Sequence, residues 1–121
     1  MIFLTVGHDI PFDRLTRAMD DWCQETGRAD VFGQIAHIGQ EGYRPQHFKW
    51  HEFLEPEEFK HQFETADLIV AHAGTGTIIT ALMLNKPVII MPRRGDLNET
   101  RNNHQVATAE RFAPRLGIDI A

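Results

Sequence analysis

A glycine-rich turn between two apolar runs is the part of this sequence best suited to chemistry. It lies in the segment VAHAGTGTIITAL and is entered by His72. Gly74 and Gly76 carry no side-chain bulk, so backbone N–H groups at the start of the following helix can point at one spot, where the helix dipole favours negative charge. The hydroxyls of Thr75 and Thr77 can add donors. The segment predicts a phosphate or diphosphate site, and a tight turn capped by threonine is the alternative.

The spacing of the glycines matches neither of two common nucleotide-binding motifs. The dinucleotide-binding fingerprint needs three glycines, and Ile79 stands at the third position. A P-loop needs a Gly-Lys-Ser/Thr sequence, which does not follow Gly76. An anion at this turn is therefore expected to be held by the backbone of a helix start.

A second polar cluster follows the next apolar run, VIIM, and a polar loop. It consists of Asn102, Asn103, His104 and Gln105. Because ligands of parallel sheets bind at the carboxyl ends of the strands, we expect this cluster at the edge that holds the glycine turn, where it could bond a hydroxyl-rich ligand. N-capping of the last helix by Asn102 or Asn103 is the alternative. Capping does not account for the histidine and glutamine that follow.

Strands and helices alternate along the chain. Apolar runs predict strands at Met1–Val6, Val31–Ile38, Phe48–Leu54, Asp67–Ala71 and Val88–Met91, with the beginning of one more at Ile118–Ile120. Apolar residues three and four apart, with Pro, Glu and Gly at the ends, predict helices from Pro11 to Gly27, from Glu55 past Phe63, over Thr75–Leu84 and over Asn103–Leu116. This order is typical of one α/β domain over residues 1–121, a Rossmann-like parallel sheet with helices on both faces.

Length and composition narrow the function classes. The chain has 121 residues and a net charge of −5, which argues against general affinity for nucleic acid or anionic lipid. No apolar run reaches the ~20 residues that span a bilayer. The start shows no signal-peptide pattern, so we expect a cytoplasmic protein without direct membrane insertion. The single cysteine, Cys23, cannot form an internal disulfide.

The remaining chemistry-bearing side chains give weaker signals. His47 and His51 are four residues apart, but the segment between them is expected to be extended, where this spacing does not give one helical ligand face. No third ligand is evident, so we expect no metal site, and no cofactor is indicated. Arg93 and Arg94 form either a solvated pair or cations that neutralise a ligand or face a partner protein.

Three separated segments resemble the donor-binding C-terminal half of the family 28 glycosyltransferases, which are of the GT-B kind. They are TVG followed by PFDRL, then ADLIVAHAGTGTIITALMLNKPVIIMPRR, and finally NNHQVATAERF. The chain is most similar to small free-standing members of the family. These include the soluble subunit of the dolichol-linked N-acetylglucosaminyltransferase and bacterial exopolysaccharide glucuronosyltransferase subunits.

The resemblance implies roles for individual residues. Contacts to the donor's diphosphate fall to His72, Gly74, Thr75, Gly76 and Thr77, and contacts to the sugar fall to Asn103, His104 and Gln105. Gly7 resembles a glycine that lets the ligand come close, and His72 is the candidate for stabilising the leaving group. Thr80 stands where many relatives carry an acidic residue that binds the ribose hydroxyls.

The resemblance further implies a UDP-sugar-dependent hexosyltransferase that acts on a lipid-linked or polysaccharide acceptor. The chain ends at Ala121, where longer relatives continue, as either a short natural form or a truncated one. Its 121 residues leave no room for an acceptor domain. We therefore expect activity only with a membrane-associated acceptor-binding subunit, which would recruit the chain to the inner face of the membrane. Asp9 and Asp96 are the candidate bases, without support from a motif. The alternatives are a non-catalytic nucleotide-sugar-binding module and an enzyme like the sugar-nucleotide 2-epimerases.

Overall fold

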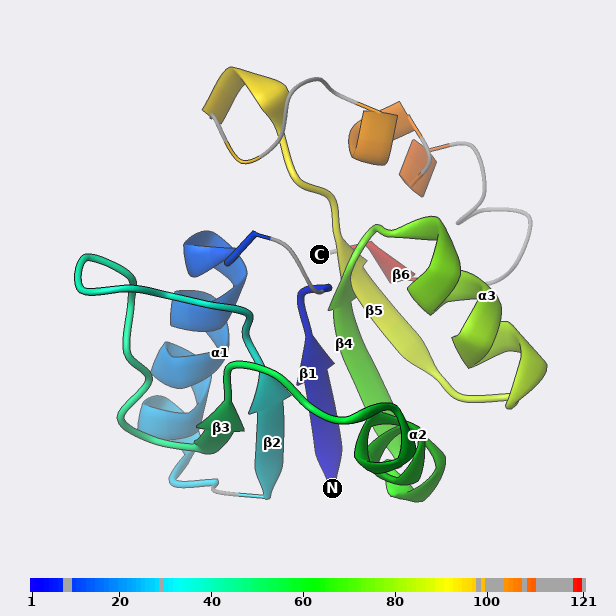
Figure 1. The fold of residues 1–121 in the computed structure, drawn as a ribbon, viewed down its shortest axis with the longest axis horizontal. Helices are drawn as coiled ribbons and strands as arrows, with labels where there is room; N and C mark the ends of the chain where they lie inside the picture. Colours follow the sequence, from blue (N-terminus) through cyan, green and yellow to red (C-terminus); the bar gives the residue numbers. More distant parts are fainter. Residues whose placement is uncertain are drawn as a thin grey trace.

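The protein is built around one parallel β-sheet (Figure 1). The computed structural model describes residues 1–7, 10–28, 30–97, 99, 104–107, 109–110 and 119–120. Its six described strands are β1 (Ile2–Thr5), β2 (Val31–Gln34), β3 (Lys49–His51), β4 (Leu68–His72), β5 (Val88–Met91) and β6 (Asp119–Ile120). They lie in the order β3-β2-β1-β4-β5-β6, and every neighbouring pair is parallel. The predicted fold class, a Rossmann-like sheet, is confirmed.

Helices cover both faces of the sheet, as the alternating pattern predicted. They are α1 (Asp13–Thr26), α2 (Pro56–Thr65), α3 (Thr75–Met83) and a short 3-10 helix, η1 (Gly95–Leu97). Residues 104–107 and 109–110 are also helical, and the rest of the predicted last helix lies outside the described residues. Gly27 ends α1 in the left-handed conformation, and Pro56 begins α2, where its missing N–H costs nothing.

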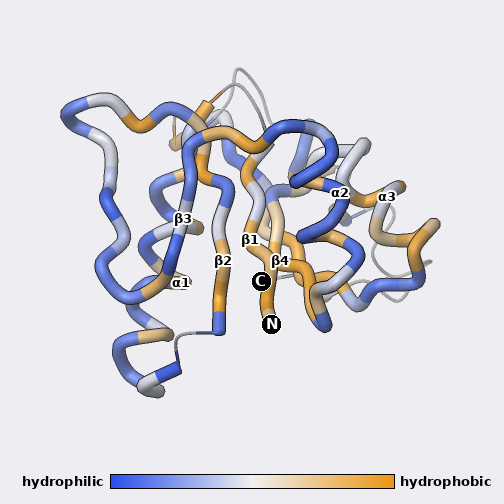
Figure 2. The backbone as a smooth tube through the Cα atoms, turned by 60° about the horizontal axis from the view of Figure 1, so that its bottom comes forward, coloured by the Kyte–Doolittle hydropathy of each residue, from blue (hydrophilic) through white to orange (hydrophobic). Residues whose placement is uncertain are grey.

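Alternate side chains of the strands form two separate cores. On one face, Ile2 and Leu4 of β1 pack in one cluster with Leu15 and Met19 of α1. On the other face, Phe3 lies edge-on to the rings of Phe59 and Phe63 of α2, at centroid distances of 5.5 and 6.0 Å. Figure 2 shows β1 and β4 as a hydrophobic centre between these layers. The two-faced burial follows from the period-two alternation of a strand.

The order of the strands locates the edge at which a ligand can bind. The chain steps from β1 to β2 in one direction and from β4 to β5 in the other. Because parallel crossovers are right-handed, opposite directions place the connecting helices on opposite faces. The reversal lies between β1 and β4, and a crevice opens there beyond the carboxyl ends of the strands. The turns after Thr5 and His72 meet at this point.

Three strands are shorter than predicted, and one is shifted by one residue. The first covers Ile2–Thr5 of the predicted Met1–Val6. The second strand ends at Gln34 instead of Ile38, because Ala36 adopts a left-handed backbone with φ of 62° that breaks the extended run. The third covers only Lys49–His51 of the predicted Phe48–Leu54. The fourth begins at Leu68 instead of Asp67 and continues through His72, which pairs with Met91 of β5 instead of opening the turn.

A buried carboxylate ties the connection between β2 and β3 to α1. Asp20 is only 1% exposed and accepts hydrogen bonds from the hydroxyl of Tyr43 and the N–H groups of Gln46 and His47. Burial raises the pKa of Asp20, but these hydrogen bonds outweigh it and place the net pKa below the ordinary value. The hydrogen bond that Tyr43 donates to Asp20, together with burial, raises the pKa of Tyr43 to about 12. The backbone N–H of His47 thus helps to hold the segment between β2 and β3 against α1 through Asp20.

Candidate functional site

A cleft of about 370 Å³ opens at the carboxyl ends of β1 and β4. It is lined by Thr5, Gly7, Phe59, His72, Gly74, Gly76 and Thr77. The structure therefore brings most of the residues predicted for the diphosphate to one place, together with Gly7. The sequence reasoning missed Thr5 and Phe59, which it had treated as parts of a strand and of an apolar helix face. No pattern in the sequence separates these two from other core residues.

The imidazole of His72 lies between two glycine backbones. A Cβ atom on Gly74 would stand 2.5 Å from Cε1 and 2.6 Å from Nε2 of this ring, and one on Gly7 would stand 3.0 Å from both atoms. Contacts below 3.0 Å force a shift, and Gly7 also has a positive φ of 88°. At Gly7 and Gly74, the absent side chain thus makes room for the histidine that faces the cleft.

The first turn of α3 presents backbone donors to the cleft. Gly74 is the N-cap with an extended backbone, and the N–H of Ile78 makes the first helical bond, to the carbonyl of Gly74 at 3.1 Å. No described residue accepts a hydrogen bond from the N–H groups of Thr75, Gly76 and Thr77. No side-chain hydrogen bond caps the helix within the described residues, so the alternative of threonine capping is wrong. The donors are placed as an anion would require.

Thr80 uses its hydroxyl proton inside α3. Its Oγ1 donates to the carbonyl of Gly76 at 2.9 Å, one turn earlier in the helix. The hydroxyl can still accept a hydrogen bond, but it cannot also donate to a ribose oxygen in this geometry. In this geometry Thr80 therefore offers a ligand an acceptor only.

Gln105 connects the polar cluster after β5 with His72. Its Oε1 accepts from the N–H of Arg93 at 3.0 Å, and its Nε2 lies 3.3 Å from Nδ1 of His72. The predicted proximity of the two sequence motifs is thus confirmed for Gln105. His104 is exposed on the same helical segment, and Asn103 lies outside the described residues. The sugar contacts predicted for these three residues stay predictions.

Arg93 is a buried cation whose side chain is engaged within the fold. It is 4% exposed, and its guanidinium donates to the carbonyls of Val6, Ile10, Pro11 and Glu99 and stacks over the ring of Phe12. Burial lowers the pKa of Arg93, while the charge of Glu99 acts in the opposite direction. This side chain fastens the segment after β1 to the segment after β5, so the solvated pair offered from the sequence is wrong for Arg93.

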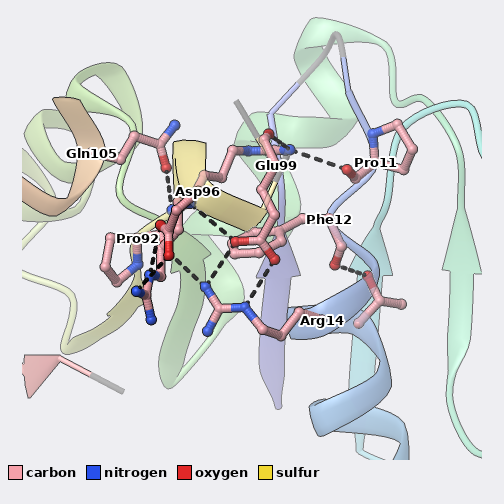
Figure 3. A network of polar contacts seen from close by, with 10 residues as sticks. Pro11, Phe12, Arg14, Pro92, Asp96, Glu99 and Gln105 are labelled. Carbon is pink, nitrogen blue, oxygen red and sulfur yellow. Dashed lines mark hydrogen bonds and ion pairs between the residues drawn. The ribbon is translucent and has the colours of Figure 1, made fainter. Parts of the chain in front are cut away.

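The charged residues beside Arg93 are also engaged within the fold (Figure 3). Glu99 accepts hydrogen bonds from Nε and Nη2 of Arg14 at 2.8 and 2.9 Å and from the N–H of Arg94 at 3.0 Å. Burial raises the pKa of Glu99, but these bonds outweigh it and leave the pKa lowered. Asp96, one of the two candidate bases, is paired with Arg94 at 2.7 Å. The other candidate, Asp9, lies outside the described residues.

A family model described as the glycosyltransferase family 28 C-terminal domain matches residues 1–116. The chain belongs to this family. A UDP-N-acetylglucosamine transferase subunit ALG13 of Candida albicans is 45% identical over 49 residues, which are 40% of this chain and 15% of that protein. The subunit of the same name from Saccharomyces cerevisiae is 40% identical over 47 residues, covering 39% of this chain and 21% of that protein.

A solved structure extends the similarity to the whole fold. The chain superposes on the NMR solution structure of ALG13 with a TM-score of 0.63 and 22% identity, covering 99% of this chain and 77% of that one. The sequence matches span about a fifth or less of the length of the curated relatives. In the part of the chain that the structure describes, no helix is long and apolar enough to cross a membrane.

Proposed function

We propose that this family 28 domain binds a UDP-sugar in the cleft at β1 and β4 and supplies the donor half of a glycosyl transfer. The observation that carries the proposal is that Gly76 and Thr77, in the first turn of α3, line one cleft together with the ring of His72. Dipole and donors at a helix start favour a diphosphate. The names of the relatives make UDP-N-acetylglucosamine the first donor to test.

The chemical task of this half is to stabilise the leaving UDP. Negative charge grows on the diphosphate as the bond between its terminal oxygen and the anomeric carbon of the sugar breaks, and fixed hydrogen-bond donors in a cleft act on that charge without reorganising. Thr75, Gly76 and Thr77 would supply backbone N–H groups, and His72 would supply its ring nitrogen. The acceptor hydroxyl also needs a base. Asp96 is engaged with Arg94, so we expect the base to come from elsewhere.

A second chain is proposed to hold the acceptor. The matched relatives are named as subunits of a transferase, which supports a division of donor and acceptor sites between chains. We propose that this partner is membrane-associated and brings the domain to the inner face of the membrane, where a lipid-linked or polysaccharide acceptor is reached. Efficient transfer from UDP-N-acetylglucosamine to a soluble acceptor by this chain alone would contradict the proposal.

The donor site can be tested with two matched substitutions in α3. Gly76→Val places a branched side chain in the cleft, where a Cβ atom meets no described residue within 4 Å apart from its own turn of α3. Met83→Val puts the same side chain at a position of the same helix that is 78% exposed and outside the cleft. Titration calorimetry with UDP should show loss of binding in Gly76→Val and unchanged binding in Met83→Val, with equal circular dichroism. Equal affinities in both variants would refute the site.

A further inference from the structure

The amide of Gln105 lies between two groups whose hydrogen-bonding roles determine its orientation. The backbone N–H of Arg93 is a donor only, so the atom 3.0 Å away must be the carbonyl oxygen Oε1. The other end of the amide is then the NH2 group, which only donates. This group stands 3.3 Å from Nδ1 of His72, so Nδ1 must accept. An imidazole nitrogen accepts only when it carries no proton, and the proton of neutral His72 must reside on Nε2.

The backbone of Arg93, whose N–H orients the amide of Gln105, is fixed within the fold. The side chain of Arg93 is buried and donates to carbonyls of the segments before and after the turn that follows β1. Its own backbone follows directly from β5. The N–H that orients Gln105 is therefore fixed by the core of the fold, and the direction of the amide does not depend on any solvent contact.

We propose that Gln105 is a positioning residue that locks His72 in the tautomer with the proton on Nε2. Of the two ring nitrogens, Nε2 lies nearer to Gly7 and Gly74, at 3.0 and 2.6 Å from the places their Cβ atoms would take compared with 3.8 and 3.3 Å for Nδ1, and both glycines line the cleft. The lock makes His72 a neutral hydrogen-bond donor toward the cleft. The consequence for the ligand rests on the proposed function, because a donor is what a diphosphate oxygen requires.

The proposal gives Gln105 a role different from a contact to sugar hydroxyls. One proton of its Nε2 and one lone pair of its Oε1 are committed to His72 and Arg93. Gln105→Glu keeps the shape and the bond from the Arg93 N–H. Its second oxygen, however, accepts hydrogen bonds where the amide donates. The carboxylate therefore selects the His72 tautomer with the proton on Nδ1 and turns Nε2 into an acceptor.

The test reads the tautomer directly. Long-range ¹H–¹⁵N spectra of the full chain without ligand, at a pH where the imidazole is neutral, distinguish protonated from unprotonated ring nitrogens. The wild type should show a protonated Nε2 on His72, and Gln105→Glu should show a protonated Nδ1. Gln24→Glu makes the same charge change at an exposed site on α1 and should leave the tautomer as in the wild type. A wild-type His72 with the proton on Nδ1, or no change in Gln105→Glu, would overturn the proposal.

A UDP titration of the same variants separates the tautomer from the function. Loss of a donor to a charged oxygen should weaken UDP binding by about tenfold or more in Gln105→Glu and leave Gln24→Glu unchanged. If the tautomer switches while the affinity stays the same, the donor role of His72 is wrong. If the wild type binds no UDP, the proposed function fails, whereas the ligand-free spectra still decide whether Gln105 sets the tautomer.

Discussion

Gly74→Ala tests whether the ring of His72 is wedged against the backbone as the structure shows. The added Cβ would stand 2.5 Å from Cε1, and ordinary contacts begin at 3.4 Å, so the ring must move by about 0.9 Å. A movement of this size compresses or breaks the 3.3 Å contact between His72 and Gln105. Overpacking of this kind costs ~1–3 kcal/mol. We expect a loss of roughly 1–2 kcal/mol in the free energy of unfolding, because the alanine also reduces the entropy of the unfolded chain.

Two controls accompany Gly74→Ala: the same substitution at Gly76, and Gly74→Ala in a protein that lacks the His72 ring. Gly76→Ala adds the same group where the described residues outside its own turn of α3 leave open space within 4 Å, so it should stabilise α3 by ~0.5–1 kcal/mol. In a His72→Ala background, the cost of Gly74→Ala should shrink by ~1 kcal/mol because the clashing ring is absent. Urea unfolding followed by the fluorescence of Trp22 and Trp50 measures all four variants. An equal cost of Gly74→Ala in both backgrounds would refute the wedged geometry.

Two further predictions concern the buried polar anchors. Arg93→Met should destabilise the fold by ~2–4 kcal/mol in urea unfolding, since it leaves buried carbonyls without donors. Arg94→Met, at the exposed pair with Asp96, should change stability by less than ~0.5 kcal/mol. Equal effects of the two substitutions would contradict the role of Arg93. Asp20→Asn should cost ~1.5–3 kcal/mol at neutral pH, compared with little for the neighbouring, exposed Asp21→Asn. Because the folded state lowers the pKa of Asp20, the wild-type advantage should be complete above the unfolded value and disappear as pH falls through the folded one, and an advantage that grows in acid would contradict the anchor.

The sheet and the place of the cleft at its carboxyl edge could be predicted from the sequence because their signals are local. Buried parallel strands read as apolar runs, as in VIIM, which is β5 without correction. The glycine turn, likewise, predicts a helix N-terminus whose backbone N–H groups have no helical acceptor. The early end of β2 was not predictable, since the left-handed backbone of Ala36 has no signature in an alanine.

The polar anchors could not be predicted because their partners are distant in sequence. The guanidinium of Arg93 meets carbonyls more than 80 residues earlier, at Val6 and Pro11. An arginine next to another arginine in a polar loop is typical of a solvated surface, and only the folded arrangement supplies the acceptors that make its burial possible. For the same reason, the sequence placed Gln105 near the cleft but did not reveal its contact with His72.

The backbone amides at the start of α3 offer the most direct test of the central claim, that this cleft is the diphosphate site. UDP titrated into the ¹⁵N-labelled chain should shift the amide signals of Thr75, Gly76 and Thr77 most, together with Gly7, and the shifts should saturate along one binding curve. The absence of shifts at these amides, or their concentration on the face of the sheet that packs against α1, would contradict the account.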